Sequence, residues 1–324
     1  MRFVPNCKTE IISEKDFSNK INEITKMLNS VKCEGNFTAF DNVNIFYEYF
    51  LAEESKANLV IVHGLSEFTK KFYELIYYFL NKGFNVFIYD QRCHGLSERL
   101  TPEINLLHVN SFNDYVKDLS HFIDEIVLKT EDKPLYIFSH SMGGAVTALY
   151  LAQNQNKIEK AVLSAPMFEP ISKQVPFKVA RASLNIGKFI FGKKRKFFLS
   201  DEFNPNVKFN PAMGQSQARF EHNMKLRIEN PNYQSTPMSF GWVSNSLNVG
   251  RKILGSSVVK KIQTPILIIS ATEDKMVNNT PQKKFFEKCK NCRFESVENA
   301  THAILASDEA ILTKVLNLTF DFLS

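Results

Sequence analysis

Short apolar runs alternate along the chain with longer segments in which apolar residues recur every three or four positions. The short runs predict buried strands at 59–63, 84–90, 135–139, 161–165, 264–270 and 293–297. The longer segments predict helices at 70–83, 111–129, 142–155, 281–290 and from about 307. Parallel strands need a connection of about helix length, so the alternation predicts a mostly parallel sheet with helices on both faces. The expected fold class is therefore a three-layer α/β domain.

The strand and helix alternation stops at about residue 170 and resumes near residue 264. Before the alternating part, residues 36–51 alternate like two strands around an Asp-Asn turn. A segment inserted after the carboxyl end of a strand lies on the face of the sheet where ligands bind, so we expect a helical cap (lid) over a pocket. The predicted organisation is an N-terminal helical extension (residues 1–35), an α/β core in two pieces (36–169 and 261–324) and a cap (170–260).

Basic charge is concentrated in the predicted cap. Of 324 residues, 44% are hydrophobic and 23% charged, which is an ordinary globular composition, and the net charge is +6. Residues 170–260 hold 15 Lys and Arg but only four Asp and Glu. The sequence KKRK at 193–196, between FIF and FFL, indicates peripheral contact with an anionic membrane; the alternative is a solvated basic face. No nucleic-acid recognition motif accompanies the charge, so no nucleic-acid partner is expected.

The N-terminus and the cysteines favour a cytoplasmic location. The first 20 residues contain no apolar stretch of secretion-signal length, and no segment offers about 18 uninterrupted apolar residues for a membrane span. The five cysteines, Cys7, Cys33, Cys93, Cys289 and Cys292, are too sparse for a disulfide scaffold. Cys289 and Cys292 form one C-x-x-C without a second Cys or His pair nearby, so a metal site is disfavoured.

Residues 135–146, LYIFSHSMGGAV, place a serine between a predicted strand and a predicted helix. A nucleophilic serine occupies such a strand-turn-helix elbow, where residues two before and two after it must be small. Ser139 and Gly143 meet that condition, and the following helix N-terminus favours developing negative charge. We therefore predict Ser141 as the nucleophile; the alternative is a helix-capping serine without chemistry.

A serine nucleophile needs a base and a group that orients the base. His302 lies in the loop after the strand at 293–297, where a histidine can reach back over the elbow. Asp274 follows the preceding strand by four residues, and Glu273 and Glu169 are competing carboxylates. The predicted triad has the chain order Ser141, Asp274, His302.

Two backbone N–H groups are expected to bind the negative oxygen that forms when serine attacks a carbonyl. One is that of Met142, directly after the nucleophile, and the other that of Leu65 in the loop after the strand at 59–63. Gly64 allows the backbone to approach closely. His63 in the same loop is predicted to be a structural hydrogen-bonding residue rather than a catalyst.

Five motifs together resemble the α/β-hydrolase superfamily, within it the monoacylglycerol lipase and lysophospholipase group, also classed with serine aminopeptidase-like hydrolases. They are VHGLSEF, YDQRCHGLSER, FSHSMGG, EDKMV and NATHAIL. The resemblance implies that Leu65 and Met142 form the oxyanion hole and that Asp90, Arg92, His94, Gly95 and Ser97 are structural. Ser139 and Cys93 each stand where the family usually has Gly, and Ala300 lies near the histidine without the Gly often found there. These departures affect fine geometry and remove no catalytic group.

The expected activity is hydrolysis of carboxylic esters of monoacyl lipids through an acyl-enzyme on Ser141, without a metal or organic cofactor. Cap aromatic residues are candidates for substrate binding: Phe189, Phe191, Phe197 and Trp242. The alternatives are an aminopeptidase-like enzyme or general carboxylesterase for small substrates, and a non-catalytic binding protein with a hydrolase fold.

Overall fold

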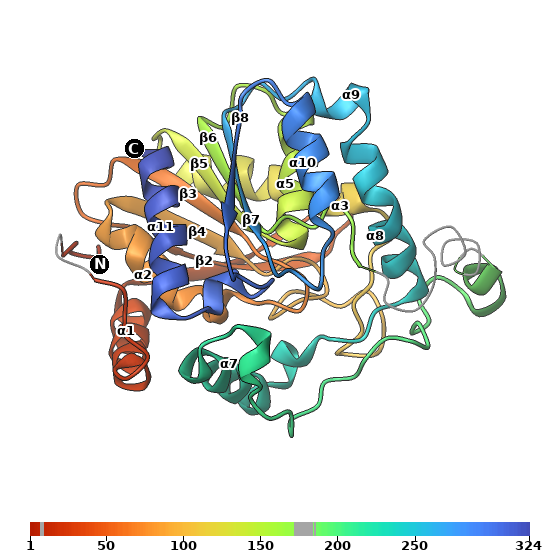
Figure 1. Cartoon of the computed structure of the whole chain (residues 1–324), viewed down its shortest axis with the longest axis horizontal. Helices are drawn as coiled ribbons and strands as arrows, with labels where there is room; N and C mark the ends of the chain where they lie inside the picture. The colour runs from red at the N-terminus through yellow and green to blue at the C-terminus, as the bar shows by residue number, and fades with distance from the viewer. Residues whose placement is uncertain (7–9, 172–183, 185) are drawn as a thin grey trace.

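A computed structural model describes residues 1–6, 10–171, 184 and 186–324. Within them a single sheet runs through the molecule with strand order β1-β2-β4-β3-β5-β6-β7-β8 (Figure 1). The pairs β1–β2 and β2–β4 are antiparallel and the other neighbours are parallel. The strands are β1 (Cys33–Thr38), β2 (Asn44–Phe50), β3 (Ala57–Val62), β4 (Phe84–Tyr89), β5 (Leu135–His140), β6 (Lys160–Ser164), β7 (Ile266–Ala271) and β8 (Cys292–Val297). The predicted α/β fold class is confirmed.

Helices cover both faces of the sheet and form two hydrophobic layers. One layer holds α3 (Phe112–Phe122), α5 (Met142–Gln153), α8 (Phe240–Ile253), α9 (Ser256–Val259) and α10 (Asn279–Lys288). The other holds α1 (Phe17–Val31), α2 (Tyr73–Asn81) and α11 (Glu309–Leu323). Every residue of β3, β4 and β7 is buried, as expected for strands between two helical layers.

The ends of the helices follow local sequence signals. The Ser111 side chain accepts from the N–H of Asn113, and the Asp114 carboxylate accepts from the N–H of Ser111, so α3 begins with a capping box. After α3 the chain continues through a π-helical turn (Ile123–Val127) into α4 (Leu128–Thr130). The helix predicted over 111–129 is therefore one continuous feature with a local change of winding.

The described part of residues 170–260 divides into two regions. The helix α7 (Gln217–Glu229) lies below the sheet in the view of Figure 1 and contacts α1 of the second layer. By contrast, α8 and α9 pack on α3 and α5, and Val249 and Ile253 belong to the hydrophobic core. The treatment of 170–260 as one separate cap stays a prediction.

Two further findings concern membrane spans and thiols. Among the described residues, no helix has the length and apolar character required to span a bilayer. Cys289 and Cys292 flank the turn between α10 and β8 and carry free thiols, as do Cys33 and Cys93. Cys7 lies outside the described residues.

Candidate active site

Ser141 occupies the turn between β5 and α5, and its backbone is in an unusual conformation. Its φ of 51° and ψ of −117° lie in a region that non-glycine residues rarely adopt. A Cβ on Gly143 would lie 2.0 Å from the carbonyl oxygen of Val62, so only glycine fits two residues after the serine. Ser139, two residues before, is buried and its hydroxyl donates to the carbonyl of Val162 at 3.2 Å. A small hydrogen-bonded side chain thus takes the place of the usual glycine.

Asp274, His302 and Ser141 form a continuous hydrogen-bonded chain. The Oγ of Ser141 lies 2.8 Å from Nε2 of His302, and Nδ1 of His302 lies 2.7 Å from Oδ2 of Asp274. With the proton on Nδ1, the imidazole donates to the carboxylate and its Nε2 accepts from the serine. The three residues follow β7, β8 and β5, whose carboxyl ends share one edge of the sheet. Such a chain can transfer the serine proton to the imidazole.

The carboxylate of Asp274 is held from two sides. Its Oδ1 accepts from the N–H groups of Met276 and Val277 at 2.8 and 2.9 Å, and its side chain is fully buried. Burial alone raises the pKa of this carboxyl, but the hydrogen bond and charge of His302 and the two N–H donors outweigh it and lower the pKa. Asp274 is therefore ionised at neutral pH.

Two backbone N–H groups beside Ser141 have no hydrogen-bond acceptor in the described part of the chain, those of Leu65 and Met142. Met142 is the first residue of α5, where helical N–H groups lack partners in the helix itself. Gly64 brings the other loop against the serine, since a Cβ there would lie 3.0 Å from the Cβ of Ser141. Both predicted oxyanion donors thus flank the nucleophile and are free to bind an anionic oxygen.

Glu67 fixes the loop that carries Leu65, a role that the sequence analysis missed. Its Oε2 accepts from the N–H of Gly64 at 2.6 Å, and its Oε1 accepts from Nζ of Lys71 at 2.6 Å. Burial raises its pKa, but the charge of Lys71 and its neighbours lower it to about 2. The signal available in the sequence was a carboxylate three residues after Gly64 and a lysine four residues further on.

The competing carboxylates Glu169 and Glu273, and His63, lie elsewhere. Glu169 binds the side-chain amide of Asn278, and Glu273 is exposed. His63 is buried and accepts from the N–H of Gln91 through Nε2, which is the structural role predicted for it. None of these side chains contacts His302 among the described hydrogen bonds.

The loop after β4 is buried and makes hydrogen bonds and ion pairs to neighbouring segments. Asp90 accepts from the N–H and hydroxyl of Thr69 and from the N–H of Leu96. Arg92 is fully buried and pairs with Asp118 and Asp41. The resemblance implies a structural role for this loop, and these contacts agree with it: Asp90 holds Thr69, which follows the loop that carries Leu65.

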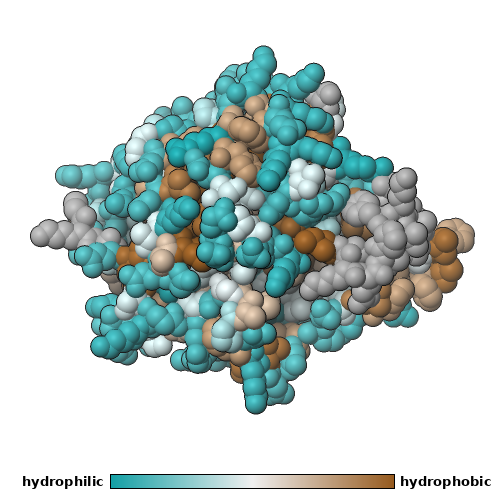
Figure 2. All heavy atoms as spheres, viewed as in Figure 1, coloured by the Kyte–Doolittle hydropathy of each residue, from teal (hydrophilic) through white to brown (hydrophobic). Residues whose placement is uncertain are grey.

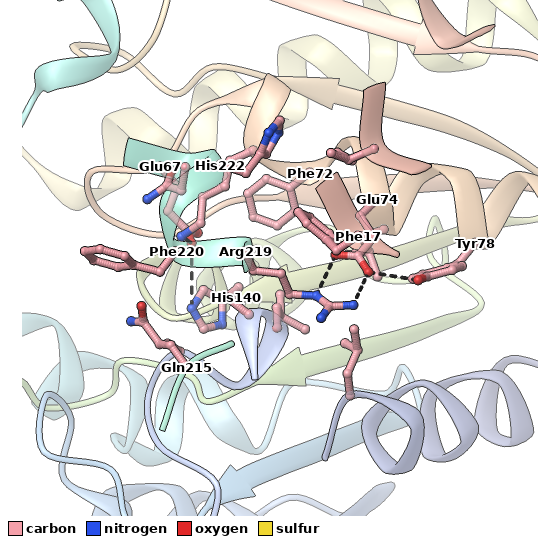
Figure 3. Close-up of a pocket in the computed structure, with 18 residues that line it drawn as sticks. Phe17, Glu67, Phe72, Glu74, Tyr78, His140, Gln215, Arg219, Phe220 and His222 are labelled. Carbon is pink, nitrogen blue, oxygen red and sulfur yellow. Dashed lines mark hydrogen bonds and ion pairs between the residues drawn. The ribbon is translucent and has the colours of Figure 1, made fainter. Parts of the chain in front are cut away.

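A cavity of about 80 Å³ lies next to the loop that carries His302, and Figure 3 draws the residues that line it. The three triad residues are not among these lining residues. One water needs roughly 10–15 Å³ by the same measure, so the space is large enough for a group bigger than one water. Its lining joins the His302 loop, the oxyanion loop, α1, α2 and α7, and includes Glu67, Lys71, His140, Ala303 and Leu305. Burial lowers the pKa of His140 to about 4, so this imidazole is neutral at neutral pH.

The four aromatic residues expected to bind substrate do not line this cavity. Trp242 is 2% exposed and packs in the core against Phe112. Phe197 packs against Phe240, while Phe189 is 92% exposed and Phe191 is 56% exposed. The cavity instead takes its aromatic residues from α1, α2 and α7, which the sequence analysis did not connect with the site.

Comparison with known proteins places the chain among lipid-cleaving enzymes by similarity. A family model described as serine aminopeptidase, S33 (Hydrolase_4) matches residues 53–309. Lysophospholipase L2 of Escherichia coli (strain K12) is 29% identical over 304 residues, which cover 89% of this chain and 86% of that protein. Probable lysophospholipase L2 of Haemophilus influenzae is 27% identical over 290 residues, covering 87% and 89%.

A solved structure shows the same fold. The crystal structure of a soluble variant of monoglyceride lipase from Saccharomyces cerevisiae, in complex with a substrate analog, superposes with a TM-score of 0.73. It is 18% identical and covers 91% of this chain and 95% of its own. At this identity the likeness concerns the fold alone.

Proposed function

Because the chain belongs to the serine aminopeptidase S33 (Hydrolase_4) family of α/β-hydrolases and is a serine hydrolase of its lysophospholipase and monoglyceride lipase group, we propose that it cleaves carboxylic esters of monoacyl lipids. Ser141, Asp274 and His302 are its catalytic residues, and the N–H groups of Leu65 and Met142 form its oxyanion hole. The assignment rests on two hydrogen bonds, from His302 to Asp274 (2.7 Å) and between Ser141 and His302 (2.8 Å), and on the φ of 51° at Ser141.

The reaction proceeds in two stages. His302 takes the proton of Ser141 as the serine oxygen attacks the ester carbonyl, and the Leu65 and Met142 N–H groups bind the resulting oxyanion. His302 then gives this proton to the departing alcohol, which leaves an acyl group on Ser141. Water, deprotonated by His302, attacks the acyl-enzyme, and His302 returns this proton to the Ser141 oxygen as the fatty acid is released. Each oxyanion donor contributes about 3 kcal/mol to transition-state stabilisation in enzymes of this kind.

The substrate class rests on the relatives. Proteins named lysophospholipase L2 and phospholipase match most of this chain, and both names describe cleavage of lipid esters. The test is a hydrolysis screen with monoacylglycerol, lysophospholipid, aminoacyl arylamide and short p-nitrophenyl esters. Turnover of the monoacyl lipids that disappears in Ser141→Ala is the expected result. Preference for the arylamide indicates an aminopeptidase, preference for the short esters a general carboxylesterase, and ligand binding without turnover a binding protein; each outcome contradicts the proposal.

We also propose that the enzyme reaches these lipids by peripheral contact with an anionic membrane. Residues 186–191 are helical and expose large apolar side chains: Ile186, Phe189, Ile190 and Phe191. Figure 2 shows hydrophobic side chains at the right-hand end of the molecule, where Figure 1 places this helix. The basic run Lys193–Lys196 follows directly, so apolar insertion and attraction to anionic head groups act at the same place.

Vesicle sedimentation tests this contact. The wild type should sediment with phosphatidylglycerol-containing vesicles and less with pure phosphatidylcholine vesicles, and a quadruple change of residues 193–196 to Gln should reduce sedimentation. Changing Lys283, Lys284, Lys288 and Lys290 to Gln removes the same charge elsewhere and is the matched control. Equal sedimentation of both variants contradicts a localised contact.

A further inference from the structure

The cavity lies next to His302: its lining includes Ala303, which directly follows His302, and His140, whose ring centroid lies 5.2 Å from that of His302. In the proposed reaction His302 delivers a proton to the leaving oxygen, so the leaving alcohol lies next to its imidazole. Three lining residues, Ala303, Leu305 and Ala306, belong to the loop that carries His302. The lining also includes His140, adjacent to the nucleophile. The cavity is therefore placed to hold the alcohol part of the ester.

Side chains of the N-terminal helix form one wall of this cavity. Phe17 and Ile21 of α1 line it and are each 2% exposed. Phe17 packs edge-on against the imidazole of His222 on α7, with 5.8 Å between ring centroids. Figure 3 shows Phe17 beside Arg219, whose guanidinium lies 4.7 Å from the centre of the Phe17 ring. The wall thus consists of α1 and α7 packed against each other.

Arg219 joins α7 to the N-terminal segment and to α2. Its guanidinium donates to both carboxylate oxygens of Glu74, at 2.9 and 2.5 Å, and to the carbonyl of Ile12 at 2.9 Å. The hydroxyl of Tyr78 donates to Glu74 at 2.8 Å and accepts from the N–H of Ile12 at 2.9 Å. Arg219 is 4% exposed, so this ion pair is shielded from solvent and is not screened as surface pairs are.

The start of α7 is held at two further points. Glu14 accepts from the hydroxyl of Ser216 and, at 2.7 Å, from the N–H of Ala218. The N–H of Ser216 donates to the carbonyl of Ala306 at 2.8 Å, which ties α7 to the His302 loop. The N-terminal segment, α7 and the His302 loop are therefore connected through consecutive hydrogen bonds. A wall fixed in this way has a defined distance from the catalytic residues.

Polar atoms in the wall indicate the chemistry of the occupant. Oδ1 of Asn223 and Nδ1 of His140 are buried without a hydrogen-bond partner in the part of the chain that the structure describes, and Nη1 of Arg219 has no hydrogen bond there but only a 3.9 Å ion pair with Glu14. Buried polar atoms without partners are unfavourable, and a polar group in the cavity supplies the missing hydrogen bonds. Phe17, Ile21 and Phe72 supply apolar surface around these atoms. This mixture of polar atoms and apolar surface suits a small alcohol that has several polar groups on a short carbon chain.

We propose that the N-terminal segment is part of the active site, and that Phe17 and Ile21 limit the size of the polar alcohol that the enzyme accepts. The inference rests on the proposed ester hydrolysis and specifies which part of the substrate the cavity holds. It assigns a role in substrate specificity to Phe17 and Ile21, although their place in the sequence, ahead of the α/β core, does not indicate such a role.

Two ester series test this role. In the first, one acyl group is joined to methanol, glycerol or glycerophosphocholine; in the second, the alcohol is methanol and the acyl chain lengthens. Phe17→Ala and Ile21→Ala remove parts of the wall. If either variant fails to fold, the conservative Phe17→Leu or Ile21→Val is assayed in its place. Leu28→Ala is the matched control, because Leu28 is fully buried on the same helix and is not part of the cavity lining.

Removal of the wall should raise kcat/KM for the glycerophosphocholine ester relative to the methyl ester by about tenfold, the usual magnitude for a change in pocket size. The acyl-length profile should not change, and Leu28→Ala should leave both profiles as in the wild type. A shift in the acyl-length profile, or wall variants that behave like Leu28→Ala, overturns the inference. A wild type that hydrolyses no ester in either series instead contradicts the proposed function.

Discussion

Replacement of Asp274 by asparagine separates the orientation of His302 from the integrity of the fold. The two residues have the same shape, and the amide oxygen can keep the bonds that Oδ1 accepts from Met276 and Val277. Its NH₂ group then occupies the position of Oδ2, 2.7 Å from Nδ1 of His302. Two donors cannot share a hydrogen bond, so His302 must place its proton on Nε2. In that tautomer Nε2 faces Ser141 as a donor and cannot accept the serine proton.

The size of the effect follows from that change of tautomer. Loss of the correct tautomer in a serine–histidine–carboxylate triad lowers kcat about 10⁴-fold, equivalent to roughly 5.5 kcal/mol of transition-state stabilisation. Stability should change much less, because both bonds to the loop N–H groups are retained, and the hydrogen bond between the carboxylate and His302 is replaced by one that the amide NH₂ donates to Nδ1. One such bond to a charged group contributes about 1.5–3 kcal/mol.

The assay compares kcat for p-nitrophenyl butyrate between the wild type, Asp274→Asn, Glu273→Gln and Glu169→Gln, together with the free energy of unfolding in urea. We expect only Asp274→Asn to lose activity, while all four proteins remain folded. A loss smaller than tenfold in Asp274→Asn refutes the reasoning, as does a large loss in Glu169→Gln, which would identify the earlier strand as the source of the acid.

Three other changes test the surroundings of the site. Gly143→Ala should destabilise the fold by about 1–3 kcal/mol or more, because its Cβ would lie 2.0 Å from the carbonyl oxygen of Val62; an unchanged thermal midpoint contradicts this. Arg92→Met should destabilise by about 3–5 kcal/mol in urea, because it leaves the buried carboxylate of Asp118 without its 2.6 Å partner. Burial raises the pKa of Glu67, but the charge of neighbouring Lys71 outweighs burial and lowers this pKa from 4.5 to about 2. The stabilising contribution of the Glu67 carboxylate is therefore complete above about pH 4.5 and is lost towards pH 2. Unfolding free energies from pH 5 to 2 should therefore fall by on the order of 3 kcal/mol more in the wild type than in Glu67→Gln, and parallel curves refute the assignment.

The sequence predicted the sheet because its strands are continuous apolar runs, which is the pattern of strands buried on both faces. It also predicted that Ser141 and His302 lie close together, because the carboxyl ends of parallel strands lie at one edge and residues just after them meet there. The departure at Ser139 did not mislead, since the packing requirement at that position is for a small side chain. These features depend on local pattern and on topology, both of which the sequence expresses directly.

The walls of the cavity could not be predicted in the same way. Arg219 and Ile12 are separated by 207 residues, and nothing in either local pattern indicates that the two segments pack together. Trp242 was expected in the pocket because it stands in the inserted segment, yet the register of α8 directs it into the core. Contacts between distant segments depend on the packing of side chains, which periodicity does not specify.

Labelling with a fluorophosphonate probe, followed by peptide mapping, tests most directly whether Ser141 is the nucleophile. The probe reacts with serines whose proton is removed by a neighbouring base, and Ser141 is the serine bonded to His302 at 2.8 Å. We predict one adduct per chain on the peptide that contains Ser141, with labelling abolished in Ser141→Ala and strongly slowed in Asp274→Asn. An adduct on another residue, or an unlabelled wild type, would contradict the account.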